Sequence, residues 1–290
     1  MNPYLLAVLL GVVEGLTEFL PVSSTAHLRI CESLLKIDLA DPYWKMFSIV
    51  IQLGAILCLP LYFRERIANF LATFPRGERG DRTAVNHPLT LVMVAFVCTA
   101  GPAFLLAKVI GKHLESLYIM AGSLIIGGIV MWVIDALYAK GALKRTTDHI
   151  EEMGFGQAVW IGCCQILSAV FPGTSRSMST IAAGQLVGMS RSAALEFSFF
   201  VSIPTMAAAT LYDLYKSMRP HHGEPSVLGQ ITFNTQSWVV LGIGFVVSFI
   251  VAYGVVAWFM NWVRNRGFAP FAIYRIIVGA AVLWWAVKGR

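Results

Sequence analysis

Two stretches of the chain combine carboxylates, hydroxyls and cations that can perform acid–base or nucleophilic chemistry. In the first stretch, Glu14 and Glu18 are four residues apart, so a helix would place both carboxylates on one face. Pro21 then ends that helix, because proline lacks an amide hydrogen and its ring crowds the preceding turn. Directly after the proline come hydroxyl residues of the type that caps helices, and a histidine: Ser23, Ser24, Thr25 and His27. The pattern predicts a helix, a break and a second helix, with ionisable groups at the break.

A second stretch, 162–180, repeats this pattern around Pro172. When the two copies are aligned on their prolines, the matching pairs are Gly11 with Gly162, Glu14 with Gln165, Thr17 with Ser168, and Ser24 with Ser175. The chemistry of the two copies differs, because the second has no counterpart of Glu18 or His27 but adds the cation Arg176. We therefore interpret the two stretches as halves of one site.

The composition places these stretches in a membrane protein. Hydrophobic residues make up 57% of the 290 residues and charged residues only 13%, against about 25% charged residues in ordinary soluble domains. Several long stretches without charge reach the roughly 20 apolar residues that a spanning helix needs. We expect an all-α polytopic protein whose residues 1–290 form a single integral membrane domain. The net charge of +6 is assigned to loops, and no nucleic-acid partner is expected.

The hydropathy pattern predicts six transmembrane helices and two re-entrant helix pairs. The six spans are predicted at about 43–63, 87–111, 116–139, 191–215, 237–262 and 270–287. The two broken pairs are predicted at 2–20 with 23–37, and at 156–171 with 175–188. Each half of the chain, about 1–140 and 150–290, then holds one broken pair and three spans. Because three is odd, the second half must be an inverted repeat of the first.

The orientation follows from the basic residues between the spans. The stretch 64–86 is predicted to be a basic loop, and the bias of Lys and Arg toward the cytoplasm places it inside. The loops 140–155 and 263–269 then also lie inside, and both chain termini and the site face outside. No removable signal peptide is expected, because the N-terminus lacks a basic region and a small-residue cleavage site.

Other polar residues within apolar segments receive a structural interpretation. Four charged residues lie near span ends or alone, and we interpret them as interfacial or structural: Asp135, Glu196, Asp213 and Arg275. The cysteines have no zinc-ligand spacing, and we interpret them as small buried hydrophobic residues: Cys31, Cys58, Cys98, Cys163 and Cys164.

The second break has the features of an anion-binding site. Gly173 allows the backbone to approach a ligand closely, and the helix that follows begins with free amides, which favour anions. The guanidinium of Arg176 can bind phosphate oxygens in a bidentate manner. The breaks therefore suit a phosphate or diphosphate, with a substrate-binding set of Ser23, Thr25, Gly173, Thr174, Ser175, Ser177 and Thr180. The glutamates would repel such a ligand unless protonated or metal-bound, so they indicate a task beyond binding.

The segments Glu14–His27 and Pro172–Thr180 resemble the two signature motifs of the bacterial undecaprenyl-diphosphate phosphatases, the bacitracin-resistance family. The resemblance covers nearly the whole chain, although Ala26 and Met178 stand where the family commonly has glycine. It implies an enzyme of the bacterial inner membrane that removes one phosphate from undecaprenyl diphosphate and recycles the carrier lipid for cell-wall synthesis. The active-site residues that it implies are Glu14, Glu18, Ser24, His27 and Arg176.

The residues allow two routes of in-line phosphoryl transfer. Ser24 could attack the terminal phosphorus, with His27 or Glu18 as its base. Direct attack by water, with Ser24 only positioning the phosphate, fits equally well. Arg176 and the two helix starts would stabilise the charge that develops on the phosphate oxygens.

The expected ligands and partners follow from the same residues. Glu14 could bind a divalent cation (Mg²⁺ or Ca²⁺) or orient a neighbouring group, and Glu18 is the second candidate ligand. No organic cofactor is expected. The expected partners are a polyprenyl diphosphate lipid and the bilayer, and the sequence also allows a homodimer.

Two other classes of protein remain open. A transporter or lipid-carrier flippase is the alternative function, because inverted repeats with broken helices are common in transporters. Membrane lipid phosphatases that use a Ser-Arg pair with two histidines fit poorly, because the first histidine after Arg176 is His221, in a polar loop.

Overall fold

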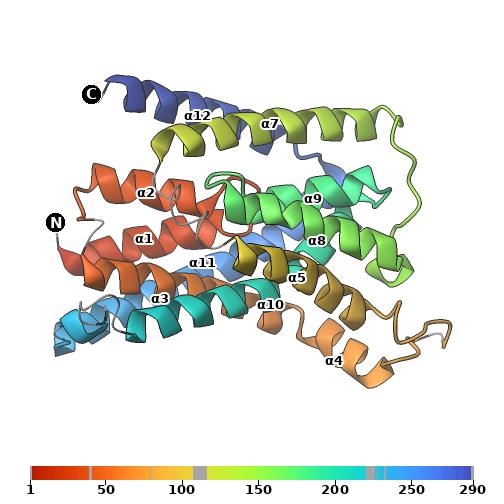
Figure 1. Ribbon diagram of the computed structural model, residues 1–290, viewed down its shortest axis with the longest axis horizontal. Helices are drawn as coiled ribbons and strands as arrows, with labels where there is room; N and C mark the ends of the chain where they lie inside the picture. The colour runs from red at the N-terminus through yellow and green to blue at the C-terminus, as the bar shows by residue number, and fades with distance from the viewer. Residues whose placement is uncertain are drawn as a thin grey trace. The chain divides into compact units, whose positions relative to one another are not determined.

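The protein is described by a computed structural model that covers residues 2–38, 41–78, 80–106, 116–219, 226, 228–231 and 233–288. All regular structure in these residues is helical, and their only β feature is an isolated bridge between Thr147 and Met189 (Figure 1). The prediction of an all-α protein is confirmed. His221 lies outside the described residues.

Among the described residues, six helices are long and apolar enough to cross a membrane, as predicted. They are α3 (Pro42–Tyr62), α5 (Pro88–Leu105), α7 (Leu117–Ala139), α10 (Arg191–Met218), α11 (Thr235–Asn265) and α12 (Ala269–Lys288). The predicted end of the second span, 107–111, lies outside the described residues. The predicted loop 64–86 is wrong in its first part, because Arg64–Thr73 forms helix α4. The charged residues of α4 favour a loop in a sequence-based prediction, but the segment is an amphipathic helix that buries Phe70.

The two broken pairs occur where the prolines predict them. Helix α1 (Pro3–Thr17) is followed by α2 (Ser24–Leu34), and α8 (Phe155–Val170) by α9 (Arg176–Leu186). At 1.5 Å per residue, the 15 residues of α1 extend only about 22 Å. A hydrocarbon core is about 30 Å thick, so neither α1 nor the similar α8 can span it alone. The inverted relation between the two halves stays a prediction.

Contacts divide the chain into two compact units. The first consists of Met1–Phe19, Ser24–Tyr62 and Ser202–Ala257, and the second of Leu20–Ser23, Phe63–Val201 and Trp258–Arg290. The turn between α1 and α2 therefore belongs to the second unit, although the helices that it joins belong to the first.

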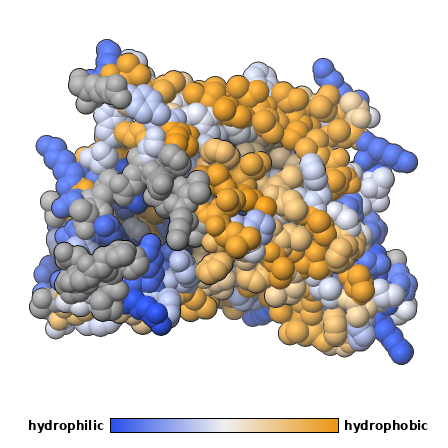
Figure 2. Space-filling view, in the orientation of Figure 1, coloured by the Kyte–Doolittle hydropathy of each residue, from blue (hydrophilic) through white to orange (hydrophobic). Residues whose placement is uncertain are grey.

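The second unit is built from paired helices. Helix α7 packs along α12, α8 packs along α5, and α9 contacts both α7 and α8 (Figure 1). Apolar side chains cover most of the visible surface over α5, α7 and α8, and hydrophilic side chains lie mainly near the helix ends (Figure 2). This distribution fits helices whose sides face lipid.

Both first arms of the broken pairs pack closely through glycine. A Cβ atom added to Gly11 would lie 2.9 Å from the carbonyl oxygen of Gly244 on α11. A Cβ atom added to Gly162 would lie 2.8 Å from the Cα atom of Ala95 on α5. Small residues at helix contacts are typical of membrane proteins, because they let helix backbones approach.

We predict that Gly162→Ala lowers the free energy of unfolding by about 1–3 kcal/mol, the usual cost of overpacking. Gly156→Ala on the same helix is the matched control, because a Cβ atom there has open space around it. Unfolding of the purified protein in detergent, followed by circular dichroism, measures both. Equal stability of the two variants would contradict close packing of α8 on α5.

Candidate active site

The first break brings a hydroxyl and a carboxylate into contact. The Ser24 hydroxyl donates a hydrogen bond to Oε2 of Glu18, at 2.5 Å. Glu18 directly follows the last residue of α1, and Ser24 is the first residue of α2. The turn between them includes Ser23 in the left-handed region, with φ +74°. A carboxylate that accepts a hydroxyl proton is positioned as a general base for a nucleophile.

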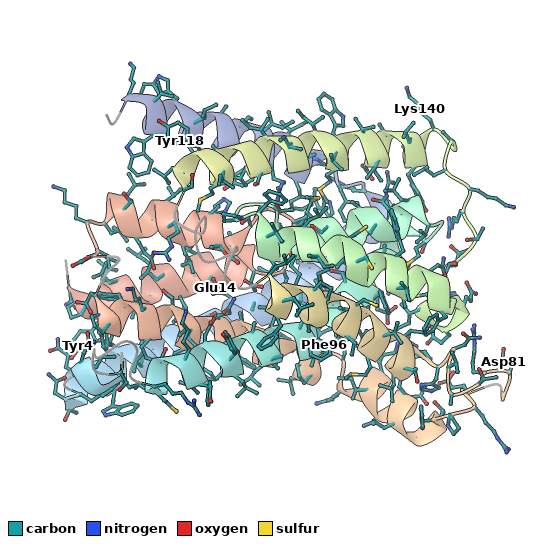
Figure 3. All side chains as sticks on the ribbon, in the orientation of Figure 1. Tyr4, Glu14, Asp81, Phe96, Tyr118 and Lys140 are labelled. Carbon is teal, nitrogen blue, oxygen red and sulfur yellow. The ribbon has the colours of Figure 1, made fainter. Side chains whose placement is uncertain are left out.

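Glu14 lies one turn before Glu18, toward the C-terminal end of α1 (Figure 3). Its side chain is 1% exposed, and neither carboxyl oxygen accepts a hydrogen bond from a described residue. A buried carboxyl group without donors is costly. It is therefore a candidate to receive a proton, a cation or a donor from a ligand.

A cavity of about 310 Å³ adjoins these groups within the first unit. Three of the predicted residues line it: Glu14, Ser24 and Thr25. The sequence reasoning did not assign seven other polar residues of its wall to the site, namely Arg29, Glu32, Asp38, Lys45, Ser48, Gln52 and Asp213. They lie on α2, α3 and α10 and in the connection between α2 and α3. Only the position of Arg29, four residues after Thr25 along α2, was a signal in the sequence. The cavity therefore combines a hydroxyl, carboxyl groups and two cations.

The wall of the cavity is ordered by polar contacts. Glu32 accepts a hydrogen bond from the Ser48 hydroxyl at 3.1 Å, and its other oxygen lies 3.8 Å from Arg29 Nη1. Lys45 at the start of α3 is exposed and supplies a second positive charge. His27, one turn after Ser24, is half-buried in α2 and is not among the residues that line the cavity.

The second break is a tight turn before α9. Ser175 has φ +70°, and its hydroxyl oxygen accepts a hydrogen bond from the Met178 amide at 3.4 Å, so it caps the helix. Gly173 has φ +93°, and a Cβ atom there would lie 2.6 Å from the carbonyl oxygen of Met120 on α7. The turn is therefore held against α7, and Thr174 within it is buried.

Several predicted binding residues of this break contact the protein itself. The Ser177 hydroxyl donates to the carbonyl oxygen of Leu20 at 2.9 Å. The Thr180 hydroxyl lies 2.6 Å from that of Ser198, and Arg176 Nη1 donates to the Ser198 carbonyl oxygen at 3.4 Å. The contact between Ser177 and Leu20 joins the two breaks, because Leu20 belongs to the first.

The observed first residues of α2 and α9 change the alignment of the two breaks that the prolines gave. Helix α2 begins at Ser24 and α9 at Arg176, and each is preceded by a serine with positive φ, Ser23 or Ser175. Ser24 therefore corresponds to Arg176, and the predicted pairing of Ser24 with Ser175 is displaced by one residue. The reason is that the second turn has one more residue after its proline than the first.

The carboxylates at the first break are too few to bind a divalent cation alone, so phosphate oxygens of a ligand or water would have to complete its coordination. The described residues contain no group of three or more His, Cys, Asp or Glu side chains that could hold a metal ion. Mg²⁺ is, however, often bound by one or two carboxylates together with substrate phosphates and water. Glu14, with its buried oxygen atoms, and Glu18 fit that incomplete donor set.

A separate cavity of about 280 Å³ is lined by α4 and the loops near it. Its charges largely satisfy one another, since Arg66 pairs with Glu151 at 2.5 Å and with Glu196 at 2.9 Å. Burial lowers the pKa of His87 at its edge. No described residue there joins a hydroxyl to a carboxylate as Ser24 and Glu18 do, so the first cavity is the better candidate.

These features define, in the described residues, a membrane protein with six helices able to span and two broken helix pairs. A serine hydrogen-bonded to a glutamate lies at one break, and an arginine begins the second helix of the other. A model of the family described as bacitracin resistance protein BacA matches residues 7–281, and the chain belongs to this family.

Similar proteins support the assignment over the full length. A protein of Koribacter versatilis (strain Ellin345) named undecaprenyl-diphosphatase is 68% identical over 288 residues, which are 99% of this chain and 100% of that protein. Proteins with the same name from Caldanaerobacter subterraneus subsp. tengcongensis and Wolinella succinogenes are 40% and 41% identical. Each alignment covers 96% of this chain, and 94% and 96% of those relatives.

Proposed function

We propose that this membrane enzyme hydrolyses undecaprenyl diphosphate to undecaprenyl phosphate and inorganic phosphate, and so recycles the carrier lipid for cell-wall synthesis. The observation that carries the proposal is the 2.5 Å contact between Ser24 Oγ and Glu18 Oε2 beside a polar cavity. The name of the relatives and the family support the same reaction.

In the proposed mechanism Ser24 attacks the terminal phosphorus while Glu18 takes the hydroxyl proton. The new bond joins Ser24 Oγ to phosphorus, and the bond from phosphorus to the bridging oxygen breaks. Undecaprenyl phosphate leaves with the electron pair of that bond. Glu18 gives its proton to the departing phosphate or to solvent and is a carboxylate again. Water then attacks the phosphorus while Glu18 takes a proton from it. The bond from phosphorus to Ser24 Oγ breaks, the serine oxygen regains a proton, and inorganic phosphate leaves.

The cations have the role of stabilising the transferring phosphoryl group. Arg176 at the start of α9 would bind its equatorial oxygens, and the amides of the two helix starts would add donors. Arg29 and Lys45 in the cavity wall would attract the diphosphate. His27 is the second candidate base, and its place one turn from Ser24 also suits it to protonate the leaving group.

Glu14 and Glu18 are the residues that would hold a divalent cation, Mg²⁺ or Ca²⁺. When bound, such an ion supplies positive charge that offsets the charge of the diphosphate and of the two carboxylates. Without it, Glu14 would need to be protonated beside an anionic substrate.

The enzyme is a multi-pass membrane protein, and we propose that it lies in the bacterial inner membrane with its site open to the outer side. The basic loops 64–86, 140–155 and 263–269 would face the cytoplasm. The cavity is lined by Ile37 and Asp38, between α2 and α3, and by Lys45. In the predicted topology the connection between α2 and α3 lies on the side of the membrane opposite to the three basic loops.

We predict that Ser24→Ala and Glu18→Gln each lower phosphate release from a polyprenyl diphosphate in detergent by about a hundredfold or more, as loss of an activated nucleophile or its base implies. Ser33→Ala, an exposed serine on the same helix, is the matched control. If folded Ser24→Ala keeps more than about a tenth of the activity, water is the attacking group. A wild type that moves the lipid across vesicles and releases no phosphate would identify a flippase instead.

Arg176→Lys is predicted to lose most of the activity although the positive charge is kept. An ammonium group cannot reproduce the bidentate geometry that a guanidinium offers to phosphate. The matched control is Arg264→Lys, at an exposed position on α11. Steady-state kinetics on both variants test this role, and turnover close to normal in Arg176→Lys would show that the residue is structural.

Removal of divalent cations by a chelator is predicted to lower phosphate release at least tenfold, with recovery when Mg²⁺ or Ca²⁺ is added back. Glu14→Gln should raise the cation concentration needed for half-maximal activity, because one of the two carboxylates is lost. Full activity of the wild type in the chelator would exclude a required cation.

A further inference from the structure

One buried cation has no part in the proposed chemistry. Arg275 on α12 is fully buried, and within the described residues it has no acidic partner. Its guanidinium instead donates to three backbone carbonyl groups. Nη1 lies 3.1 Å from the oxygen of Pro21, and Nη2 lies 3.1 Å from that of Ser123 and 3.0 Å from that of Gly173. One side chain therefore contacts both breaks and α7.

The two carbonyl groups occupy equivalent places in the two breaks. Pro21 lies three residues before Ser24, where α2 begins, and Gly173 lies three residues before Arg176, where α9 begins. Each also lies two residues before a serine with positive φ. Arg275 thus binds the same point of both turns, directly ahead of the residues with the proposed chemical roles.

The surroundings are built to admit this guanidinium. A Cβ atom added to Gly127 on α7 would collide with Arg275 Nη2, and one added to Gly128 would lie 3.2 Å from Arg275 Cβ. Two adjacent glycines therefore make the space through which the side chain crosses from α12 to the breaks. The guanidinium has a planar fork of donors, which suits several carbonyl groups at once.

We infer that Arg275 is a positioning residue, which fixes the turn 20–23 and the turn 171–175 relative to each other. It thereby holds the backbone directly ahead of Ser24 and directly ahead of Arg176 in the conformation that phosphoryl transfer needs. The kinetic part of this inference rests on the proposed function. The structural part, that Arg275 holds both turns closed, does not.

The first test compares Arg275→Met with Arg275→Lys. In folded Arg275→Met we expect kcat to fall about a hundredfold or more while KM stays within about threefold, because misplaced groups weaken the transition state rather than substrate binding. Arg275→Lys should be intermediate, since one ammonium replaces only part of the fork. Arg191→Met is the control: Arg191 pairs with Asp135 at 2.7 Å in the same unit and does not contact the breaks. Its kcat should stay within about threefold of the wild type.

The second test keeps Arg275 and displaces its side chain by a substitution at a neighbouring glycine. Gly127→Ala should displace the guanidinium and lower kcat at least tenfold. Gly122→Ala on the same helix, where a Cβ atom has open space, should not change it. If Arg275→Met does not fold, the comparison of Gly127→Ala with Gly122→Ala tests the positioning role of Arg275.

Amide hydrogen exchange gives a measurement that needs no substrate. Peptides that cover 20–24 and 172–176 should exchange at least tenfold faster in Arg275→Met or Gly127→Ala than in the wild type, and not faster in Arg191→Met or Gly122→Ala. Unchanged exchange in both test variants, or the same loss of kcat in the controls, would overturn the inference. A wild type that releases no phosphate would refute the proposed function, while the exchange result would still decide the role of Arg275.

Discussion

The structure depends on one constraint, the need to provide hydrogen bonds for non-helical backbone at membrane depth. Lipid offers no donors or acceptors, so an interrupted helix must find them within the protein. Here the carbonyl groups of Leu20, Pro21 and Gly173 receive their donors from Ser177 and Arg275. A charged side chain at the centre of a spanning helix costs about 2.5–3.5 kcal/mol on insertion scales. Hydrogen bonds to charged groups contribute about 1.5–3 kcal/mol each, so the three made by Arg275 offset this cost.

The turns carry backbone strain as well. Ser23 and Ser175 adopt φ values of +74° and +70°, which residues with a Cβ atom rarely adopt. Such conformations cost on the order of 1–3 kcal/mol each and persist only where the surroundings determine them. In both breaks the strained residue directly precedes the start of the second helix. The strain therefore sets the direction in which Ser24 and Arg176 leave the turn.

The sequence was sufficient to predict the six apolar helices and the two breaks, because hydropathy and the two prolines are local signals. It predicted Glu18 only as one of two candidate bases for Ser24, since His27 lies three residues after Ser24 on the same helix, while Glu18 lies six residues before it across the turn. Helix α4 was missed because its charge and the Pro and Gly residues after it indicate a loop. Arg275 was expected to be interfacial or structural, but its partners could not be predicted: its three acceptors are backbone carbonyl groups 102 to 254 residues away along the chain, which no residue type reveals. Arg29, Lys45 and Asp213 likewise meet only when separate helices pack.

The shortness of α1 has a consequence for where the reaction takes place. A helix of 15 residues that begins at one surface ends well inside a layer about 30 Å thick. In the proposed topology α1 begins at the outer surface, so Glu14 and Glu18 at its inner end would lie at the depth of the acyl chains rather than of the headgroups. In that arrangement a diphosphate would sink below its neighbouring headgroups to reach them, while its polyprenyl tail stays in hydrocarbon. The length of α1 would fix the depth of this descent, so turnover would depend on how well the thickness of the bilayer matches the protein.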